Sequence, residues 1–225
     1  MRKTGCFLIG LVLAATAIFF VPPHVLAVNS ASYIDFVIEA PHPDGIAVSW
    51  WGGASPLTGL NISVTGIQGD RSDDDFLGIT GGLLSFTTGP LTSYDNTSWH
   101  FGSGGNIALT GGVSALGIAS PDTLLLWGSF SEVSVLKVDT RFKVILASSY
   151  NELNADVANF FGVSGPYVGS LNLSFFSNES PGQPFTATSL QGGQIEATSV
   201  PVPAAFWLFG SGLFGIAALR KRRSV

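Results

Sequence analysis

Short segments in which apolar and polar residues alternate, separated by glycine-rich turns, run through the middle of this chain. The segments 141–146 and 171–175 both alternate in this way. A period of two places every second side chain on the same face, which is typical of a β-strand with one buried face. Glycine pairs, for example at positions 52 and 53, favour tight turns between strands. The pattern predicts a mainly β domain, folded as an antiparallel, jelly-roll-like β-sandwich or, as the alternative, as a barrel-like fold.

The alternation also predicts which side chains point inward. In the segment 60–65, Leu60, Ile62 and Val64 fall on one face and are expected in the core. The other expected strands are equally short and are bounded by turn residues. The expected strands cover residues 33–39, 47–51, 60–65, 83–88, 98–101, 106–110, 123–130, 132–138, 141–146, 171–175, 185–190 and 194–198.

One short helix is expected in the same domain. From residue 151 to residue 161 the apolar residues recur at helical spacing. Ser149 or Asn151 would cap the start of this helix, and Gly162 would end it. We expect the helix to cover an open end or edge of the sheet.

The first 27 residues have the layout of a secretory signal peptide. Arg2 and Lys3 form a basic start, residues 6–21 are apolar, and small residues precede an expected cleavage after Ala27. A transmembrane anchor is the alternative, but the apolar run is short and two prolines follow it. We therefore expect the Sec translocon and signal peptidase to act on the chain, leaving residues 28–197 as the exported β-sandwich domain.

Composition narrows what the exported part can bind. Between residues 28 and 199, four Lys and Arg residues stand against 15 Asp and Glu residues, which gives a formal net charge of −11. Nucleic-acid binding needs basic patches, so nucleic acid is excluded as a partner. Cys6 is the one cysteine of the chain and lies in the expected signal peptide. The exported part therefore lacks a disulfide and a thiolate nucleophile.

The last 26 residues form three consecutive blocks. The Val-Pro-Val-Pro block is expected to be extended, because proline fixes its own φ and moves the preceding residue out of the helical region. The apolar block, residues 204–219, would span about 24 Å as a transmembrane helix, against a bilayer core of roughly 30 Å. The basic block, residues 220–223, would stop transfer of the chain, because its cations stay on the side of the membrane where they began. The residues that define the blocks are Val200, Pro201, Val202, Pro203, Ala204, Trp207, Gly210, Gly212, Arg220, Lys221, Arg222 and Arg223.

In order and spacing these blocks resemble the PEP-CTERM sorting signal, with Val202 at the place of the glutamate that names the family. The resemblance covers residues 198–225 and implies handling by exosortase, an integral-membrane cysteine protease or transpeptidase. Proteins with this signal occur in Gram-negative bacteria that make extracellular polysaccharide. The resemblance therefore implies export across the inner membrane, transient anchoring by the C-terminal helix, and delivery to the cell surface or extracellular matrix. The alternative is an ordinary tail anchor.

One acidic cluster contains Asp70, Asp73, Asp74 and Asp75. Calcium prefers several carboxylate and carbonyl oxygens from a flexible loop, so these four residues are candidate calcium ligands. The alternative is a solvated loop, because the alternating order of an EF-hand is missing. No other cofactor or metal site is expected.

Trp50 and Trp51 are candidate glycan contacts, because an aromatic ring can pack against the C–H groups of a pyranose. The two residues are adjacent in an expected strand, so their side chains point to opposite faces. In a sandwich without disulfides, tryptophans more often belong to the core. We therefore expect one of the two to face away from the side that buries the other.

Signatures of catalysis are weak in this sequence. Neither His42 nor His100 has a metal-ligand spacing or a Gly-x-Ser-x-Gly motif as its partner. We therefore expect no enzyme, and the favoured function is a non-catalytic surface or matrix protein associated with exopolysaccharide, as in a biofilm. The alternatives are a carbohydrate- or calcium-dependent binding module at the same place and, more remotely, a polysaccharide-active enzyme whose carboxylates come from distant strands.

Overall fold

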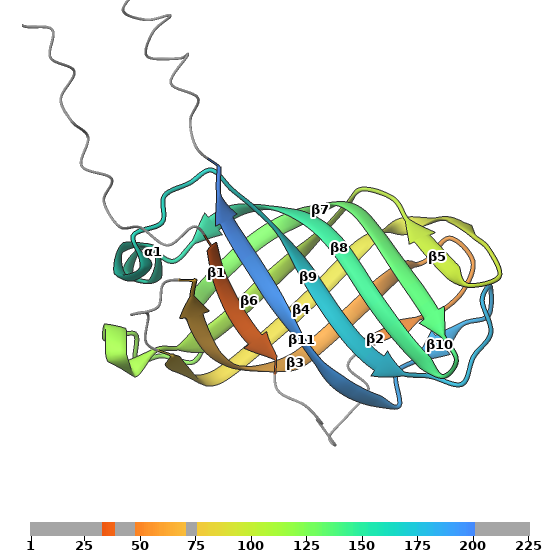
Figure 1. Cartoon of the computed structure of the whole chain (residues 1–225), viewed down its shortest axis with the longest axis horizontal. Helices are drawn as coiled ribbons and strands as arrows, with labels where there is room; N and C mark the ends of the chain where they lie inside the picture. Colours follow the sequence, from red (N-terminus) through yellow and green to blue (C-terminus); the bar gives the residue numbers. More distant parts are fainter. Residues whose placement is uncertain (1–32, 39–47, 71–75, 201–225) are drawn as a thin grey trace, which may run out of the picture.

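A computed structural model describes residues 33–38, 48–70 and 76–200 (Figure 1). These residues form one antiparallel sheet with one short α-helix, so the expectation of a mainly β antiparallel domain with one helix is confirmed. The elements are β1 (Tyr33–Ile38), β2 (Val48–Trp50), β3 (Pro56–Gly69), β4 (Leu77–Tyr94), β5 (Ser98–Phe101), β6 (Gly104–Gly112), the 3₁₀ helix η1 (Ser114–Leu116), β7 (Leu124–Val138), β8 (Arg141–Leu153), α1 (Ala155–Phe161), β9 (Tyr167–Phe176), β10 (Phe185–Thr186) and β11 (Ser189–Ser199).

The sheet closes on itself. Strands β1, β3, β4, β6, β7, β8, β9 and β11 pair in that order, and β11 pairs with β1 to complete the ring. In Figure 1 these strands wrap, tilted, around a common axis. The short strands β2, β5 and β10 are additional to this ring. β2 pairs with β3, and β10 pairs with β2. β5 pairs with both β4 and β7.

The strand order corrects the jelly-roll-like part of the expectation. Each long strand of the ring lies next to the long strand that follows it in the sequence, so the described order is up-and-down, whereas a jelly roll joins its strands through Greek-key crossovers. Alternation within single strands cannot distinguish the two, because both orders give each strand one buried and one exposed face.

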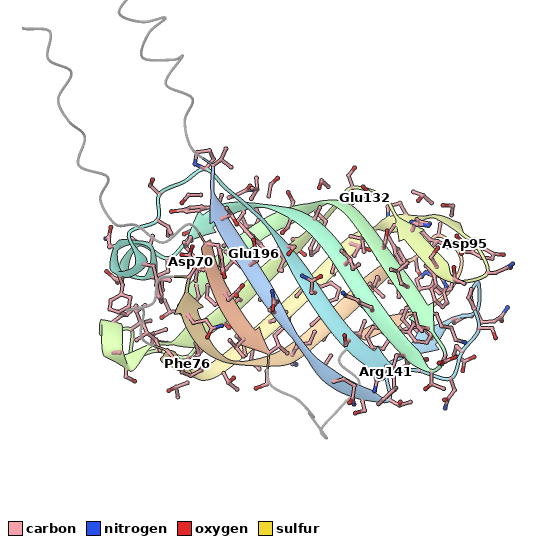
Figure 2. The ribbon with its side chains drawn as sticks, in the orientation of Figure 1. Asp70, Phe76, Asp95, Glu132, Arg141 and Glu196 are labelled. Carbon is pink, nitrogen blue, oxygen red and sulfur yellow. The ribbon has the colours of Figure 1, made fainter. Side chains whose placement is uncertain are left out.

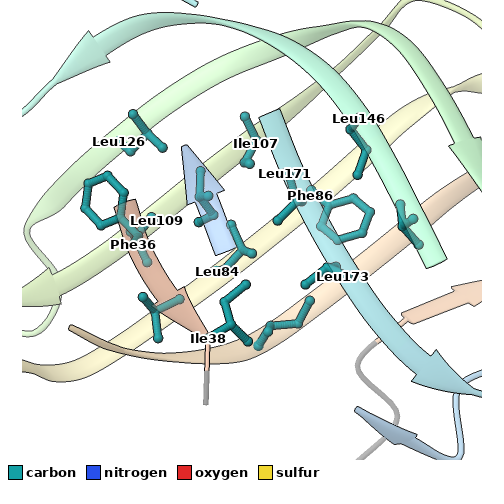
Figure 3. Packing of buried hydrophobic residues seen from close by; sticks show 14 of the residues in the cluster. Phe36, Ile38, Leu84, Phe86, Ile107, Leu109, Leu126, Leu146, Leu171 and Leu173 are labelled. Atoms are coloured by element: carbon teal, nitrogen blue, oxygen red, sulfur yellow. The ribbon is translucent and has the colours of Figure 1, made fainter. Parts of the chain in front are cut away.

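The core fills the interior of the closed sheet with the side chains that the alternation places inward. Phe142, Val144 and Leu146 of β8 are fully buried, as predicted. Figure 3 shows Leu146, together with Leu171 and Leu173 of the neighbouring strand β9, among the packed side chains. Burial of each large apolar side chain stabilises the fold by roughly 1.5–3 kcal/mol, so this core is the main source of stability in a domain without disulfides.

Leu60 is a correction to the predicted core. Ile62 and Val64 are buried as expected, but Leu60 is 60 % exposed. The pairing of β3 with β4 shifts between Gly59 and Ile62, and Asn61 takes a positive φ of 52°. This β-bulge inserts an extra residue, which turns Leu60 outward although the sequence alternation continues unbroken.

The helix begins later than expected. Asn154 is the N-cap of α1, and its side chain accepts hydrogen bonds from the backbone N–H groups of Asp156 and Val157. The predicted caps, Ser149 and Asn151, belong to β8 instead. Gly162 ends the helix in the left-handed conformation, as expected. The helix lies at one end of the ring of strands (Figure 1).

The expected signal peptide (residues 1–27, with cleavage at Ala27), the transmembrane helix 204–219 and the basic stop 220–223 lie outside the described residues. Within the ranges that the structure does describe, there is no helix with the length and apolar character needed to cross a bilayer.

Candidate functional site

Trp50 and Trp51 point to opposite faces, as their adjacency predicts. Trp50 is 2 % exposed, and its indole N–H donates a hydrogen bond to the Ser55 carbonyl over 3.0 Å. Its ring lies edge-on to Phe101, with a centroid separation of 6.3 Å. Trp51 is 73 % exposed at the end of β2. Of the two candidate glycan contacts, Trp51 therefore has the free aromatic face.

The turn that follows Trp51 packs against a second turn close to another exposed aromatic ring. A Cβ added to Gly52 would lie 2.9 Å from Cγ of Pro184, so the two turns are in contact. Two residues before Pro184, a Cβ on Gly182 would lie 2.6 Å from the ring of Tyr94, which is also exposed. Trp51 and Tyr94 thus flank the turn that precedes β10.

A polar groove lies on the outer face of the sheet, over β8, β9 and β11. It is open to solvent and has a volume of about 420 Å³. The strand register explains how it forms, because Lys143 lies opposite Ser174, and Asn172 lies opposite Gln194. All of these side chains occupy outward positions of their strands. The groove is lined by Lys143, Asn172, Ser174, Gln191, Gly192, Gly193 and Gln194.

Glycines keep the floor of this groove close to the backbone. The pairing of β11 with β9 shifts between Leu190 and Gly192, and Gly192 has a φ of 114°, a conformation that favours glycine. A Cβ on Gly193 would lie only 2.2 Å from the carbonyl oxygen of Asn172. The same Cβ would lie 2.8 Å from Cδ2 of the buried Leu173, so a side chain at position 193 would meet the core, and Gly193 contributes only backbone to the groove. β-Bulges are frequent beside binding sites, where they re-aim neighbouring side chains.

A group of carboxylates lies elsewhere on the outer face. Asp35 of β1 is directly opposite Glu196 of β11. Burial raises the pKa of Asp35, and the negative charges of Glu196 and then Asp70 raise it further. Figure 2 labels Glu196 and Asp70 toward the end of the ring that carries α1, while Arg141 lies toward the other end. The sequence pattern identified neither this pair nor the groove, since both depend on which strands are neighbours.

The predicted calcium cluster is only partly within the described residues. Asp70 directly follows β3, whereas Asp73, Asp74 and Asp75 lie outside the described residues. Among the residues with described positions, no three His, Cys, Asp or Glu side chains come together as a metal site would require. Calcium binding by this cluster stays a prediction.

His100 is held by two hydroxyl groups on the outer face. Its Nε2 lies 3.0 Å from the Ser98 hydroxyl, and its Nδ1 lies 3.1 Å from the Ser134 hydroxyl across the β5–β7 pair. Both ring nitrogens therefore have a structural partner. The other histidine of the expected exported part, His42, lies outside the described residues.

The C-terminal segment follows the last strand without an intervening element. β11 ends at Ser199, and the backbone N–H of Val200 donates to the carbonyl of Pro166 over 2.9 Å. The PEP-CTERM protein-sorting motif matches residues 199–223. The chain carries a PEP-CTERM sorting motif. The motif spans the Val-Pro, apolar and basic blocks, and it indicates an exported protein that is processed by exosortase and sorted to the cell surface. Comparison with curated proteins and with solved structures found no match for this chain.

Proposed function

We propose that this protein is a non-catalytic component of the cell surface or extracellular matrix, delivered by exosortase processing and retained in exopolysaccharide. The observation that carries the proposal is the position of the PEP-CTERM motif, which begins at the last residue of β11. All of the closed sheet except Ser199 thus precedes the motif. Cleavage within residues 201–223 would separate the folded domain from its tail without removing any strand.

The distribution of side chains supports a binding or structural role for the domain. The interior of the closed sheet is packed with apolar side chains, so a ligand meets the outer face or the ends of the ring. The outer face offers the polar groove, and one end offers the exposed ring of Trp51. Amides, hydroxyls and a free aromatic face are the groups that contact a polymer of sugars.

Two observations favour the alternatives named from the sequence. The groove and Trp51 favour a carbohydrate-binding module at the cell surface, which is compatible with a matrix role.

The Asp35–Glu196 pair brings together two carboxylates from the first and last described strands, as a polysaccharide-active enzyme would require. A polysaccharide incubated with the protein should show no new reducing ends. Cleavage that is lost in Glu196→Gln would establish the enzyme instead.

The sorting step is tested by replacing both Pro201 and Pro203 with alanine in the native host. Loss of the two prolines removes the pre-formed extended segment, so we expect uncleaved protein that stays in the membrane fraction. Pro184→Ala, in the exposed turn before β10, is the matched control and should leave processing unchanged. Intact-mass measurement of the mature protein reports both terminal cleavages and any attached group. Normal processing of the double variant would remove the recognition role of these prolines.

Retention in exopolysaccharide is tested by comparing the native host with a strain that makes no extracellular polysaccharide. We expect the mature protein in the matrix fraction of the first strain and in the culture medium of the second. A protein that remains with the washed cells in both strains is held by something else, and the matrix role would then be wrong.

Calcium dependence is tested by the melting temperature of the mature protein. If the residues around Asp70 hold calcium, millimolar calcium should raise the melting temperature, and replacing Asp73, Asp74 and Asp75 with asparagine should abolish the rise. An unchanged melting temperature would leave these residues as a solvated loop.

A further inference from the structure

We propose that the groove over β8, β9 and β11 binds an acidic polysaccharide, with Lys143 holding a sugar carboxylate and the amides of Asn172 and Gln194 holding sugar hydroxyls. The inference rests on the proposed function, because it names the chemistry of the polymer that would retain the protein. The site differs from the tryptophan pair that the sequence suggested.

The side chains of the groove can form the hydrogen bonds that sugar hydroxyls need. A side-chain amide offers both donors and an acceptor, which matches a hydroxyl group that both donates and accepts. The amide of Asn172 donates to the Ser170 hydroxyl over 3.2 Å, and this contact orients its remaining polar atoms. Within the described part of the chain, the side chains of Lys143, Ser174 and Gln194 make no hydrogen bond. They are therefore available to a ligand.

The groove has a size and an opening that suit a sugar polymer. A volume of about 420 Å³ lies in the range of ligand sites, and the groove is open to solvent, so a short stretch of a longer polymer can enter it. Gly192 and Gly193 leave the backbone bare at its floor. The outward-facing Ile145, opposite Asn172, is 38 % exposed and adds apolar surface beside the amides. Sugar rings present both kinds of group, since hydroxyls alternate with C–H faces.

Most of the positive charge of the domain lies close to the groove. The segment 28–199 has four cations, and three of them, Lys137, Arg141 and Lys143, lie on the β7–β8 hairpin. Arg141 and Lys143 are two residues apart on β8, so they share its outer face. This is a basic spot on a domain that is otherwise strongly acidic. An anionic ligand is therefore attracted here and repelled from the carboxylates near the other end (Figure 2).

The closed sheet argues against the other polymers that bind to sheets. An extended peptide gains most of its affinity by pairing with a free strand edge. β8, β9 and β11 are each paired on both sides, so their backbone groups are occupied and only side chains face the ligand. A nucleic acid would need many phosphate contacts from lysine and arginine, and the segment 28–199 has only four such residues. A hydroxyl-rich polymer with spaced carboxylates fits both constraints.

The inference is tested by calorimetric titration of the mature protein with three probes at low salt. The probes are an oligogalacturonate, a neutral cello-oligosaccharide of equal length, and a poly-glutamate peptide. We expect the oligogalacturonate to bind and the other two to bind at least about tenfold more weakly, a difference of about 1.4 kcal/mol. Affinity for the oligogalacturonate should also fall as salt rises, because the groove is open to solvent.

Variants locate the binding in the groove. Lys143→Gln and Gln194→Ala should each weaken binding of the oligogalacturonate by about tenfold, the effect of losing one hydrogen bond to a charged or polar ligand group. Lys137→Gln removes the same charge outside the groove, where the Lys137 ammonium donates to the Glu179 carbonyl and lies over the Phe142 ring, and it should change the affinity less than about twofold. Melting curves confirm that each variant is folded, and Lys143→Arg should restore most of the affinity.

The outcomes separate this inference from the proposed function. Equal binding of poly-glutamate would show that charge alone is recognised, and equal binding of the neutral oligosaccharide would show that the carboxylate contact is wrong. Unchanged affinity in Lys143→Gln would place binding outside the groove. Each of these results overturns the inference while matrix retention in the native host still stands. Protein that is absent from the matrix but binds oligogalacturonate through Lys143 would overturn the proposed function alone.

Discussion

Asp35 and Glu196 face each other directly across the β1–β11 pair, where the ring of strands closes. Desolvation of the Asp35 carboxyl, followed by the charges of Glu196 and Asp70, holds its pKa above the ordinary value. The folded state therefore binds this proton more tightly than the unfolded state does. The stability that this provides is complete below the unfolded pKa and is lost as pH rises through the folded pKa.

Replacing Asp35 with asparagine should stabilise the protein at neutral pH. The change removes one of two facing carboxylates, and like charges directly opposite in a sheet cost roughly 0.2–1 kcal/mol. Urea unfolding at pH 7 should show this gain. The gain should shrink as pH falls to about 4 and below, where the carboxyl of the unfolded chain takes up its proton. A gain that is independent of pH would mean that charge is not its cause.

Asp95 is the matched control, because its pKa shift has the opposite sign. Hydrogen bonds from the Thr97 backbone and from Ser98 lower the pKa of Asp95 to about 2. Its contribution is present above the unfolded pKa and is lost as pH falls through about 2. Asp95→Asn should therefore give no gain in stability at pH 7, and unfolding experiments that show a gain would contradict the assignment.

The two neighbouring tryptophans should differ sharply when each is replaced by alanine. Trp50→Ala leaves a cavity beside Phe101 and should cost roughly 3–5 kcal/mol of unfolding free energy. Trp51→Ala removes an exposed ring and should change stability by less than about 0.5 kcal/mol. Thermal melting distinguishes the two. If Trp51 contacts glycan, its variant should also lose retention in the matrix while remaining fully folded.

Two glycines provide a further pair of variants. A Cβ on Gly59 would lie 2.1 Å from the ring of Phe86 in the core, so Gly59→Ala should cost roughly 1–3 kcal/mol through overpacking. No heavy atom lies within 4 Å of a Cβ built on Gly78, so Gly78→Ala should be neutral or slightly stabilising. Denaturant midpoints that are equal for the two would argue against the inward packing of Phe86.

The helix cap gives the last prediction. Asn154→Ala removes the acceptor for the N–H groups of Asp156 and Val157 and should cost about 1 kcal/mol. Asn151→Ala changes an exposed residue of β8 and should cost less than about 0.5 kcal/mol. Because the sequence favoured Asn151 or Ser149 as the cap, the comparison distinguishes the observed start of α1 from the expected one. A larger loss in the Asn151 variant would favour the earlier start.

Single strands were predictable wherever alternation is regular. The segments 141–146 of β8 and 171–175 of β9 alternate without interruption, so the inward positions of Phe142 and Leu173 follow from the sequence. Bulges limited the prediction of the other strands, because an extra residue reverses the face to which the following side chains point without altering the hydrophobic pattern of the sequence. A register shift between Phe130 and Glu132 lies within β7, which the sequence divided into two strands. The glycines at 81 and 82 are also a pair of the kind that favours a turn, but they lie within β4.

The surface sites were not predictable, because each depends on strand order. Lys143, Asn172 and Gln194 were each recognisable as outward polar residues of separate strands, but only the order β8–β9–β11 brings them together. Asp35 and Glu196 lie near opposite ends of the described chain, and closure of the ring makes them neighbours. By contrast the tail was predictable, because its recognition depends on the linear order of its blocks and not on folding.

Because β1 pairs with β11, a polypeptide that crosses a membrane from its N-terminus can close the ring of strands only at the end of its transfer. All the other ring strands can form hairpins as they emerge, but pairing of β1 with β11 must wait for the last described strand, which runs directly into the sorting motif. A contact between such distant segments is also slow to form. Maturation of this domain and the arrival of its tail at the processing enzyme therefore fall at nearly the same moment.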